Sequence, residues 1–204
     1  MPTGICSIPA MFPFVIEMHE QLDSTNSAAK QRILKQEDLS YHALLCRDQK
    51  KGRGTKGRSW VSLDGNIFLS AVIPLPGVPD SEQLSLSSGL AVLRTVELLC
   101  SAPDISAAPQ ISLKWPNDVL INGEKVSGIL IEIVESFAVI GVGLNLVDAP
   151  PLATYLNKYA NNVSFWPAVY TLLLKLSTIA AKTRYPAEKL EWCVNKKNIQ
   201  TPPI

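Results

Sequence analysis

The chain has 204 residues, of which 47% are hydrophobic and 18% charged, and its formal net charge is +1. This length suffices for one good-sized domain with a core, and the composition excludes a disordered chain. Because the charges nearly cancel, overall charge does not favour a polyanionic partner, and any basic function must be local. No stretch approaches the roughly 20 uninterrupted apolar residues that a membrane-spanning helix needs.

The cysteines and the first residues indicate the compartment. Cys6, Cys46, Cys100 and Cys193 lie far apart and include no C-x-x-C spacing. This favours buried free thiols in a reducing compartment over disulfides. The N-terminal stretch has no leading Lys or Arg and is interrupted by prolines, unlike a signal peptide. We therefore expect a cytoplasmic protein with a single domain over residues 1–204.

Apolar periodicity divides the chain into predicted elements. The first helix begins in a run of capping residues, D-S-T-N, and an Asn122-Gly123 pair between two apolar runs predicts a β-hairpin. In chain order we expect a strand at 12–22, a helix at 23–35, strands at 41–49 and 66–75, a helix at 80–100, a hairpin within 111–134, a strand at 137–146 and a helix at 165–185.

The order of these elements decides the fold class. The predicted strands come in adjacent, hairpin-like groups and do not alternate strictly with helices. That order favours an α+β fold, in which helices pack on a mixed β-sheet, over a doubly wound parallel sheet.

A glycine-rich loop, Q-K-K-G-R-G-T-K-G-R-S-W at 49–60, has the G-x-G-x-x-G spacing. In a dinucleotide-binding loop the third glycine opens a helix and an acid follows about 20 residues later. Here R-S-W-V-S-L-D-G-N follows Gly57, and the strand at 66–75 contains no acid. The loop has five cations and no acid, which favours wrapping of a phosphate by backbone N–H groups and arginine side chains. A solvated basic loop and a nucleic-acid patch stay open as alternatives.

Four further patterns carry polar residues or glycines. D-S-T-N at 23–26 is at least a capping cluster, and K-W-P-N-D at 114–118 is at least a turn, because its proline breaks a strand. K-x-x-G at 125–128 and G-V-G-L-N at 141–145 place glycines inside strands. Interior glycines mark a bulge or the close approach of a ligand. Together with the cationic loop, they suggest a groove in which a flat or extended ligand lies against backbone.

The patterns as a set resemble a known family. D-S-T-N, Q-x-x-G-R-G-x-x-G-R-x-W, K-W-P-N-D, K-x-x-G-I-L-x-E and G-x-G-x-N occur in the order and spacing of the catalytic domain of biotin protein ligases, from about residue 14 to Trp192. The resemblance implies the biotin/lipoate ligase catalytic fold, which is similar to that of class II aminoacyl-tRNA synthetases. It also implies an ATP-dependent enzyme that forms biotinyl-5′-AMP and then biotinylates a lysine of a biotin carboxyl carrier protein, a subunit of acetyl-CoA carboxylase.

The resemblance also implies roles for single residues. Lys125, Arg53 and Asp118 are the expected catalytic residues, with Lys125 between the biotin carboxylate and the α-phosphate. Asp118 orients the acceptor lysine or helps to hold Mg²⁺, which otherwise comes with ATP. The expected biotin-binding residues are Ser24, Thr25, Asn26, Gln49, Gly52, Arg53, Lys125, Gly128, Leu130 and Gly141. The expected ATP-binding residues are Lys56, Arg58, Trp60, Lys114, Asn117 and Asn145.

The chain departs from the family at one loop position and in its length. The family loop usually reads G-R-G-R-x-G-R-x-W, and Thr55 stands at its second arginine. This removes a phosphate donor, in part offset by Lys56, and predicts looser retention of the adenylate. We expect neither a helix-turn-helix domain before the first strand nor a β-barrel after Trp192. We therefore expect no DNA binding and no membrane association, and a homodimer stays open.

Three other functions stay open. A lipoate ligase or octanoyl transferase would share the fold and a lysine like Lys125, but these relatives lack the G-R-G-x-x-G-R cations. A catalytically weakened biotin-binding or carrier-binding domain would explain Thr55 and the short C-terminus. An NAD-dependent oxidoreductase is disfavoured by the loop, for the reasons above.

Overall fold

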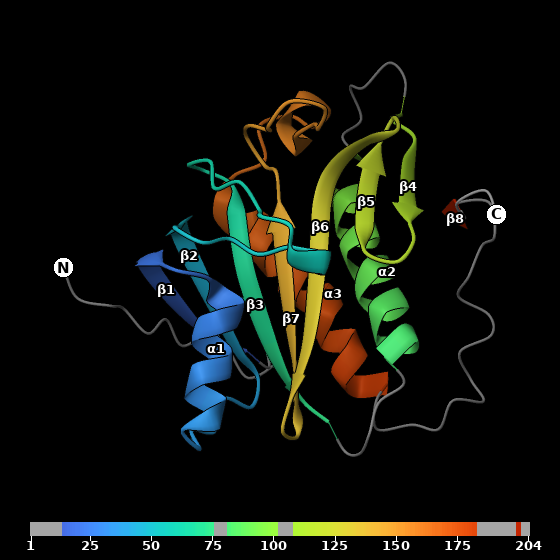
Figure 1. Cartoon of the computed structure of the whole chain (residues 1–204). Helices are drawn as coiled ribbons and strands as arrows, with labels where there is room; N and C mark the ends of the chain where they lie inside the picture. The colour runs from blue at the N-terminus through green and yellow to red at the C-terminus, as the bar shows by residue number, and fades with distance from the viewer. Residues whose placement is uncertain (1–13, 76–80, 102–107, 183–198, 201–204) are drawn as a thin grey trace.

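The computed structural model describes residues 14–75, 81–101, 108–182 and 199–200. In this part of the chain, one sheet contains eight strands in the order β1-β2-β3-β7-β6-β5-β4-β8 (Figure 1). The strands are β1 (Val15–Leu22), β2 (His42–Gln49), β3 (Ile67–Pro74), β4 (Ile111–Lys114), β5 (Asp118–Ile121), β6 (Glu124–Val134), β7 (Phe137–Leu144) and β8 (Ile199–Gln200). The helices are α1 (Thr25–Leu34), α2 (Ser81–Leu99) and α3 (Phe165–Lys182), with short 3-10 turns η1 (Thr55–Gly57) and η2 (Leu156–Lys158).

The sheet is mixed, as the element order predicts. β1 pairs with β2 in parallel, and β4 pairs with β8 in parallel. The other neighbours, from β2 to β4 across the sheet, are antiparallel. The α+β fold class is therefore confirmed, and the predicted elements have observed counterparts. Residues 12–13, at the start of the first predicted strand, and residues 183–185, at the end of the last predicted helix, lie outside the described residues.

Helices cover both faces of the sheet. α2 and α3 pack against each other behind the strands in Figure 1, and their apolar side chains, such as Val96 and Leu172, share a core with Leu69 and Ile140. α1 lies on the front face over a smaller cluster that includes Val72. Because side chains alternate along a strand, β3 sends Leu69 to one face and Val72 to the other. The polar site lies on the front face, beside α1.

Two turns that the sequence predicts are present in the structure. Asn122 and Gly123 form the turn between β5 and β6 with positive φ angles of 52° and 85°, which is the turn that an Asn-Gly pair favours. The K-W-P-N-D stretch forms the turn between β4 and β5, so Pro116 does end a strand. The hairpin and the turn are both confirmed.

The described cysteines are free and buried. Burial raises the pKa of Cys100 to about 11 and also raises the pKa of Cys46 above its ordinary value. Both groups are therefore neutral thiols at pH 7, as predicted. Cys6 and Cys193 lie outside the described residues.

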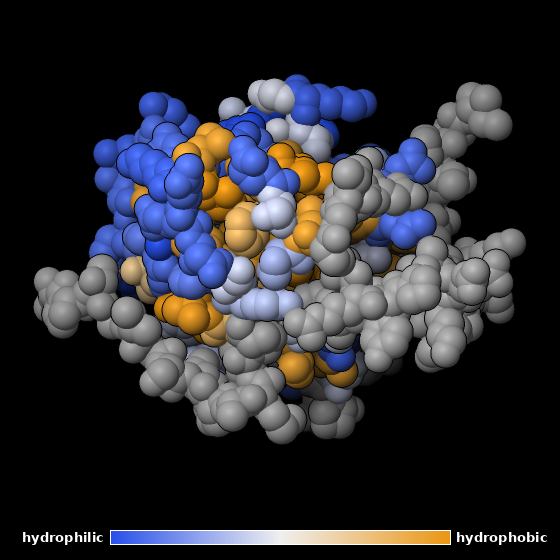
Figure 2. All heavy atoms as spheres, turned by 90° about the horizontal axis from the view of Figure 1, so that it is seen from below, coloured by the Kyte–Doolittle hydropathy of each residue, from blue (hydrophilic) through white to orange (hydrophobic). Residues whose placement is uncertain are grey.

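The outer surface varies from one side of the molecule to the other. Seen from below, hydrophilic side chains dominate the left of the molecule, where α1 and β1 lie in Figure 1, and apolar side chains show toward the middle (Figure 2). None of the helices in the described ranges combines the length and apolar character of a membrane-spanning segment.

Candidate functional site

A cavity of about 300 Å³ opens on the face of the sheet that carries α1. The loop between β2 and β3, teal in Figure 1, crosses in front of β7 and β6 and forms one wall. The start of α1 and the segment 150–153 form other walls. The residues expected from sequence that line the cavity are Ser24, Thr25, Asn26, Gln49, Arg53, Arg58, Trp60, Asn117, Lys125, Gly128, Leu130, Gly141 and Asn145.

Four expected residues do not line the cavity. Gly52 is buried behind it, and a Cβ there would come within 2.5 Å of the Trp60 carbonyl oxygen, so only glycine lets the loop close. Lys56 and Lys114 are exposed, and Lys56 has a positive φ of 56°. The structure therefore does not bring these two lysines to the site. Asp118 lies behind the wall, in contact with Lys125.

The floor of the cavity is a buried chain of polar side chains at the start of α1. The backbone N–H of Thr25 donates to Gln49 Oε1 at 2.9 Å. The Ser70 hydroxyl lies 2.7 Å from Thr25 Oγ1 and 2.6 Å from Asn26 Oδ1, two acceptors for its one proton. Ser24 is the N-cap residue by position, but its side chain makes no capping hydrogen bond. The D-S-T-N run thus builds the site as well as the helix start.

Ser70 does not line the cavity but hydrogen-bonds Thr25 and Asn26, which do, and the sequence reasoning missed this supporting residue. It is fully buried on β3, within the run I-F-L-S-A-V-I-P. A lone hydroxyl in an otherwise apolar buried strand needs a partner, because an unpaired buried polar group costs free energy. That is the signal by which the sequence could have indicated it.

The glycines of β6 and β7 seat an aromatic ring of the chain itself. Gly128 and Gly143 are paired across the two strands, and the Trp60 indole lies on both. A Cβ on Gly128 would come within 2.6 Å of Trp60 Cζ3. Indole Nε1 is buried and has no hydrogen-bond partner among the described residues. In this structure, the flat group that lies against these strands is therefore Trp60, where the sequence suggested a ligand.

Lys125 extends from β6 into the cavity wall. Its ammonium lies 2.7 Å from Asp118 Oδ1 and 5.3 Å from the centre of the Trp60 ring. The contact with Asp118 is an ion pair without hydrogen-bond geometry, because Oδ1 accepts no hydrogen bond within the described residues. The side chains of Lys125 and Asp118 are 30% and 13% exposed. A cation is thus held beside an aromatic face, at the edge of the polar floor.

The tip of the glycine loop folds onto Thr55. Arg58 donates to Thr55 Oγ1 at 2.8 Å and to the Thr55 carbonyl at 3.2 Å. Asn117 Nδ2 lies 3.4 Å from Thr55 Oγ1 and 3.2 Å from the Ile129 carbonyl oxygen, to both of which it donates. Thr55, at the position of a family arginine, therefore links the loop tip to the turn before β5.

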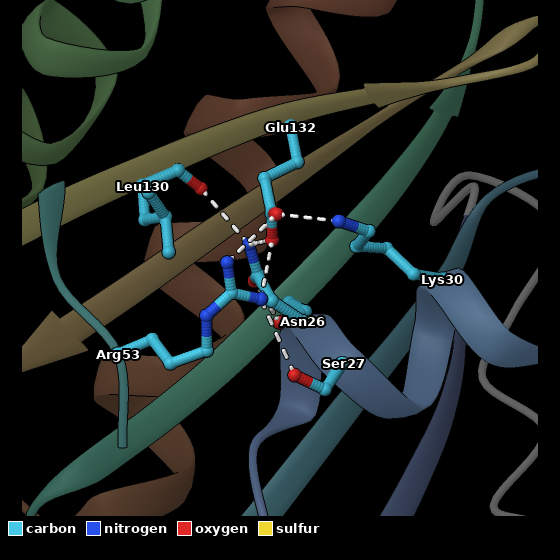
Figure 3. A network of polar contacts seen from close by, with 7 residues as sticks. Asn26, Ser27, Lys30, Arg53, Leu130 and Glu132 are labelled. Carbon is cyan, nitrogen blue, oxygen red and sulfur yellow. Dashed lines mark hydrogen bonds and ion pairs between the residues drawn. The ribbon is translucent and has the colours of Figure 1, made fainter. Parts of the chain in front are cut away.

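A carboxylate on β6 accepts hydrogen bonds from α1 and from the glycine loop (Figure 3). Glu132 accepts from Lys30 of α1 at 2.7 Å, from Asn26 at 3.0 Å, and from Arg53 of the loop at 3.1 and 3.3 Å. Burial by itself raises the pKa of Glu132, but the hydrogen bonds from Lys30 and Asn26 and the charge of Arg53 outweigh it and hold the pKa below its ordinary value. The sequence motif contains this glutamate, but the sequence reasoning gave it no role.

The end of β7 is joined to the segment 150–153. Asn145 is 2% exposed, and its Nδ2 donates to the Thr154 carbonyl at 3.1 Å. This bond places Pro150, Pro151 and the 97% exposed Leu152 at the rim of the cavity. No sequence signal indicated this rim, because its position depends on a contact between two loops.

The described residues contain no group of three His, Cys, Asp or Glu side chains arranged for a metal ion. The carboxylate nearest Lys125, Asp118, is held in the ion pair with that lysine. The cations and backbone donors around the cavity fit an anionic ligand.

The mixed sheet with helices on both faces, crossed by a glycine-rich cationic loop, is a fold of the class II synthetase-like type. Residues 18–145 match the biotin/lipoate A/B protein ligase family, and the chain belongs to this family. The family resemblance seen in the sequence is thus confirmed.

Relatives in this family include two biotin–[acetyl-CoA-carboxylase] ligases. The protein from Mycobacterium tuberculosis is 38% identical over 138 residues, which cover 66% of this chain and 50% of that protein. The protein from Paracoccus denitrificans is 40% identical over 141 residues, which cover 65% of this chain and 55% of that protein. The chain thus spans about half the length of these curated relatives.

Solved structures of biotin protein ligases have the same fold. The Leishmania major enzyme in complex with biotinyl-5-AMP has a TM-score of 0.68 at 28% identity, over 81% of this chain and 74% of that chain. The Aquifex aeolicus enzyme in complex with biotin and ATP also has a TM-score of 0.68 at 28% identity, over 82% of this chain and 70% of that chain.

Proposed function

We propose that the protein is an ATP-dependent biotin protein ligase. It would join biotin to ATP to form biotinyl-5′-AMP and pyrophosphate, and then transfer the biotinyl group to a lysine of a biotin carboxyl carrier protein. The observation that carries the proposal is the Lys125 ammonium, held at the wall of a cavity between a buried polar floor and a cationic glycine loop. The relatives named as biotin ligases support it.

The first step brings anions together. A biotin carboxylate oxygen attacks the α-phosphorus of ATP, a new P–O bond forms, and the bond to the β-phosphate breaks to release pyrophosphate. Lys125 neutralises the carboxylate and the α-phosphate in turn, because a compact ammonium can follow charge as it moves. The ion pair with Asp118, at 2.7 Å, positions the ammonium before substrates arrive.

The second step transfers the biotinyl group. The amine of the acceptor lysine attacks the biotinyl carbonyl carbon, and the bond to the phosphate oxygen breaks to release AMP. Asp118 is the carboxylate beside Lys125, and it orients the incoming amine once Lys125 has turned to the phosphate. Mg²⁺ would arrive on the ATP phosphates, whose charge it screens.

The cavity divides into two ends. The floor of Thr25, Asn26 and Gln49, supported from behind by the buried Ser70, offers hydroxyl and amide groups suited to the ureido ring and tail of biotin. The nucleotide end is lined by Arg58, Trp60, Asn117 and Asn145. Indole Nε1 lacks a partner in the described part of the chain, so a ligand oxygen that accepts from it would remove the cost of a buried unpaired donor.

We propose a cytoplasmic location and a carboxyl carrier domain of acetyl-CoA carboxylase as the protein partner. ATP supply and the neutral buried thiols of Cys46 and Cys100 suit a reducing compartment. The near-neutral charge of the chain supports no DNA-binding role.

Pyrophosphate release tests the proposal. The protein is mixed with biotin, ATP and Mg²⁺, with and without a biotin carboxyl carrier domain, and labelling of the carrier is followed by mass. We expect release that depends on biotin, and a biotinylated carrier. Stabilisation of the fold by lipoate or octanoate, without stabilisation by biotin, would move the assignment to the lipoyl branch of the family. Binding of biotin without release would contradict the ligase activity.

A further inference from the structure

The carboxylate of Glu132 has every acceptor position occupied. A carboxylate offers about four lone-pair sites. Here Oε1 accepts from Lys30 and Arg53 Nη2, and Oε2 accepts from Asn26 and Arg53 Nη1, at distances of 2.7 to 3.3 Å. The side chain is 14% exposed. It is therefore fixed on all sides, in the arrangement that Figure 3 shows.

Glu132 stands on a strand in the middle of the sheet. Its residue pairs with Val139 in the central β6–β7 ladder, which is in register from Ser127 to Val134. The Arg53 side chain is 43% exposed and comes from a loop without regular structure apart from η1. Glu132 is therefore held in place by the sheet, whereas the position of Arg53, on the loop, depends on its contact with Glu132.

The position of Arg53 sets the rest of the loop. Arg53 forms a short antiparallel bridge with Ser59. On either side of this bridge, the Trp60 N–H donates to the Gly52 carbonyl at 2.9 Å and the Gly54 N–H donates to the Arg58 carbonyl at 2.7 Å. The two strands of the loop therefore move together, and whatever holds Arg53 also holds Trp60 over the sheet.

The same carboxylate reaches the floor of the cavity. Asn26 donates to Glu132 through Nδ2 and accepts from Ser70 through Oδ1. Ser70 also contacts Thr25, which lies against Gln49. One carboxylate thus connects the loop above the cavity with the polar groups below it.

We infer that Glu132 is a positioning residue, which holds Arg53 and so keeps the glycine loop across the cavity in register with its floor. Its effect on catalysis rests on the proposed function; its effect on the loop does not. In this structure the Arg53 guanidinium faces Glu132 and Ser27, not the Lys125–Asp118 pair. Arg53 therefore acts first as the attachment of the loop.

A purely structural role for Glu132, as a staple between β6 and α1 through Lys30, makes a different prediction. Lys30→Met removes the ion pair with α1 and leaves the pair with Arg53. Glu132→Gln weakens both. Arg53→Lys keeps the ion pair between Lys30 of α1 and Glu132, and it replaces the bidentate guanidinium contact with Glu132 by a single ammonium. Because the Arg53 side chain is 43% exposed, this last variant leaves the core intact.

The test measures the loop and the reaction separately in the full chain. Hydrogen exchange of the peptide 50–60, read by mass spectrometry without ligands, reports loop attachment, because the Gly54 and Trp60 amides are internally bonded. The KM for biotin and kcat come from pyrophosphate release. We expect Glu132→Gln to raise both the exchange rate and the KM by about tenfold, the change that corresponds to loss of one charge-assisted contact. kcat changes less, because the residue acts on binding geometry.

We expect Arg53→Lys to change both readouts in the same direction, and Lys30→Met to leave both near wild type. Equal effects of Lys30→Met and Glu132→Gln would overturn the inference in favour of the staple. Wild-type exchange in folded Arg53→Lys would overturn it as well, even if Glu132→Gln failed to fold. An inactive wild-type protein would contradict the proposed function and leave the exchange result to decide the loop.

Discussion

The seat of Trp60 on the sheet gives the sharpest quantitative expectation. In Gly128→Ala, the new Cβ would lie 2.6 Å from Trp60 Cζ3 and 3.1 Å from Lys125 Cε and Nζ. Carbon atoms in good contact lie about 3.5 Å apart or more, so the indole must move by about 1 Å. Overpacking of this kind costs about 1–3 kcal/mol. We expect the lower half of that range, because Trp60 is only partly buried and can turn outward.

Movement of the Trp60 indole in this variant also disturbs Lys125. In the wild type, the Lys125 ammonium lies 5.3 Å from the centre of the Trp60 ring. In Gly128→Ala the ring moves away from this position, and the new Cβ also crowds the end of the lysine side chain. Lys125 then no longer keeps the position from which it would contact the reacting groups. We therefore expect Gly128→Ala to lower biotin-dependent pyrophosphate release by more than its loss of stability explains.

Urea unfolding at constant slope, together with the release assay, measures both effects. Gly54→Ala is the matched control for stability, because Gly54 has an extended φ of −118° and its added Cβ would meet Arg58 O at an ordinary 3.4 Å. The reasoning is refuted if Gly128→Ala unfolds at the same urea concentration as Gly54→Ala.

Three further outcomes are expected. Lys125→Ala should lose adenylate formation by several orders of magnitude while circular dichroism stays native; near-normal pyrophosphate release would remove Lys125 from its role. Thr55→Arg should slow dissociation of the adenylate by about tenfold through one added charged contact, measured by rapid filtration, and equal rates would contradict the expectation. Because the folded pKa of Glu132 lies below its unfolded value, its contribution to stability is present above about pH 4.5 and is lost as pH falls through the folded pKa. The difference in unfolding free energy between wild type and Glu132→Gln should therefore shrink from pH 7 to pH 3, and a constant difference would exclude this linkage.

Much of the fold is encoded locally and could be predicted. The turn at Asn122 and Gly123, the break at Pro116 and the start of a helix within D-S-T-N depend on residues next to one another. Apolar periodicity depends on neighbours two to four positions apart. These signals suffice for the order of the elements and for the mixed sheet that the structure describes.

The candidate site was predicted in part, for the same reason. Most of the residues expected to bind substrates do line one cavity, because the motifs that contain them lie at the ends of predicted elements or in the loop. Lys56 and Lys114 do not, although the sequence offers them as cations equal to the others. Which way a cation points depends on the backbone around it, such as the positive φ of Lys56.

The sequence by itself determined the family, the element order and the set of polar residues from which the site is drawn. Only the tertiary structure decided what those residues contact. In the folded protein the Trp60 ring packs on Gly128 and Gly143, and Arg53 binds Glu132, which lies 79 positions away along the chain. Such contacts depend on strand register and on how a loop crosses a sheet. No local pattern encodes them, because they arise between segments that meet only after the sheet has formed.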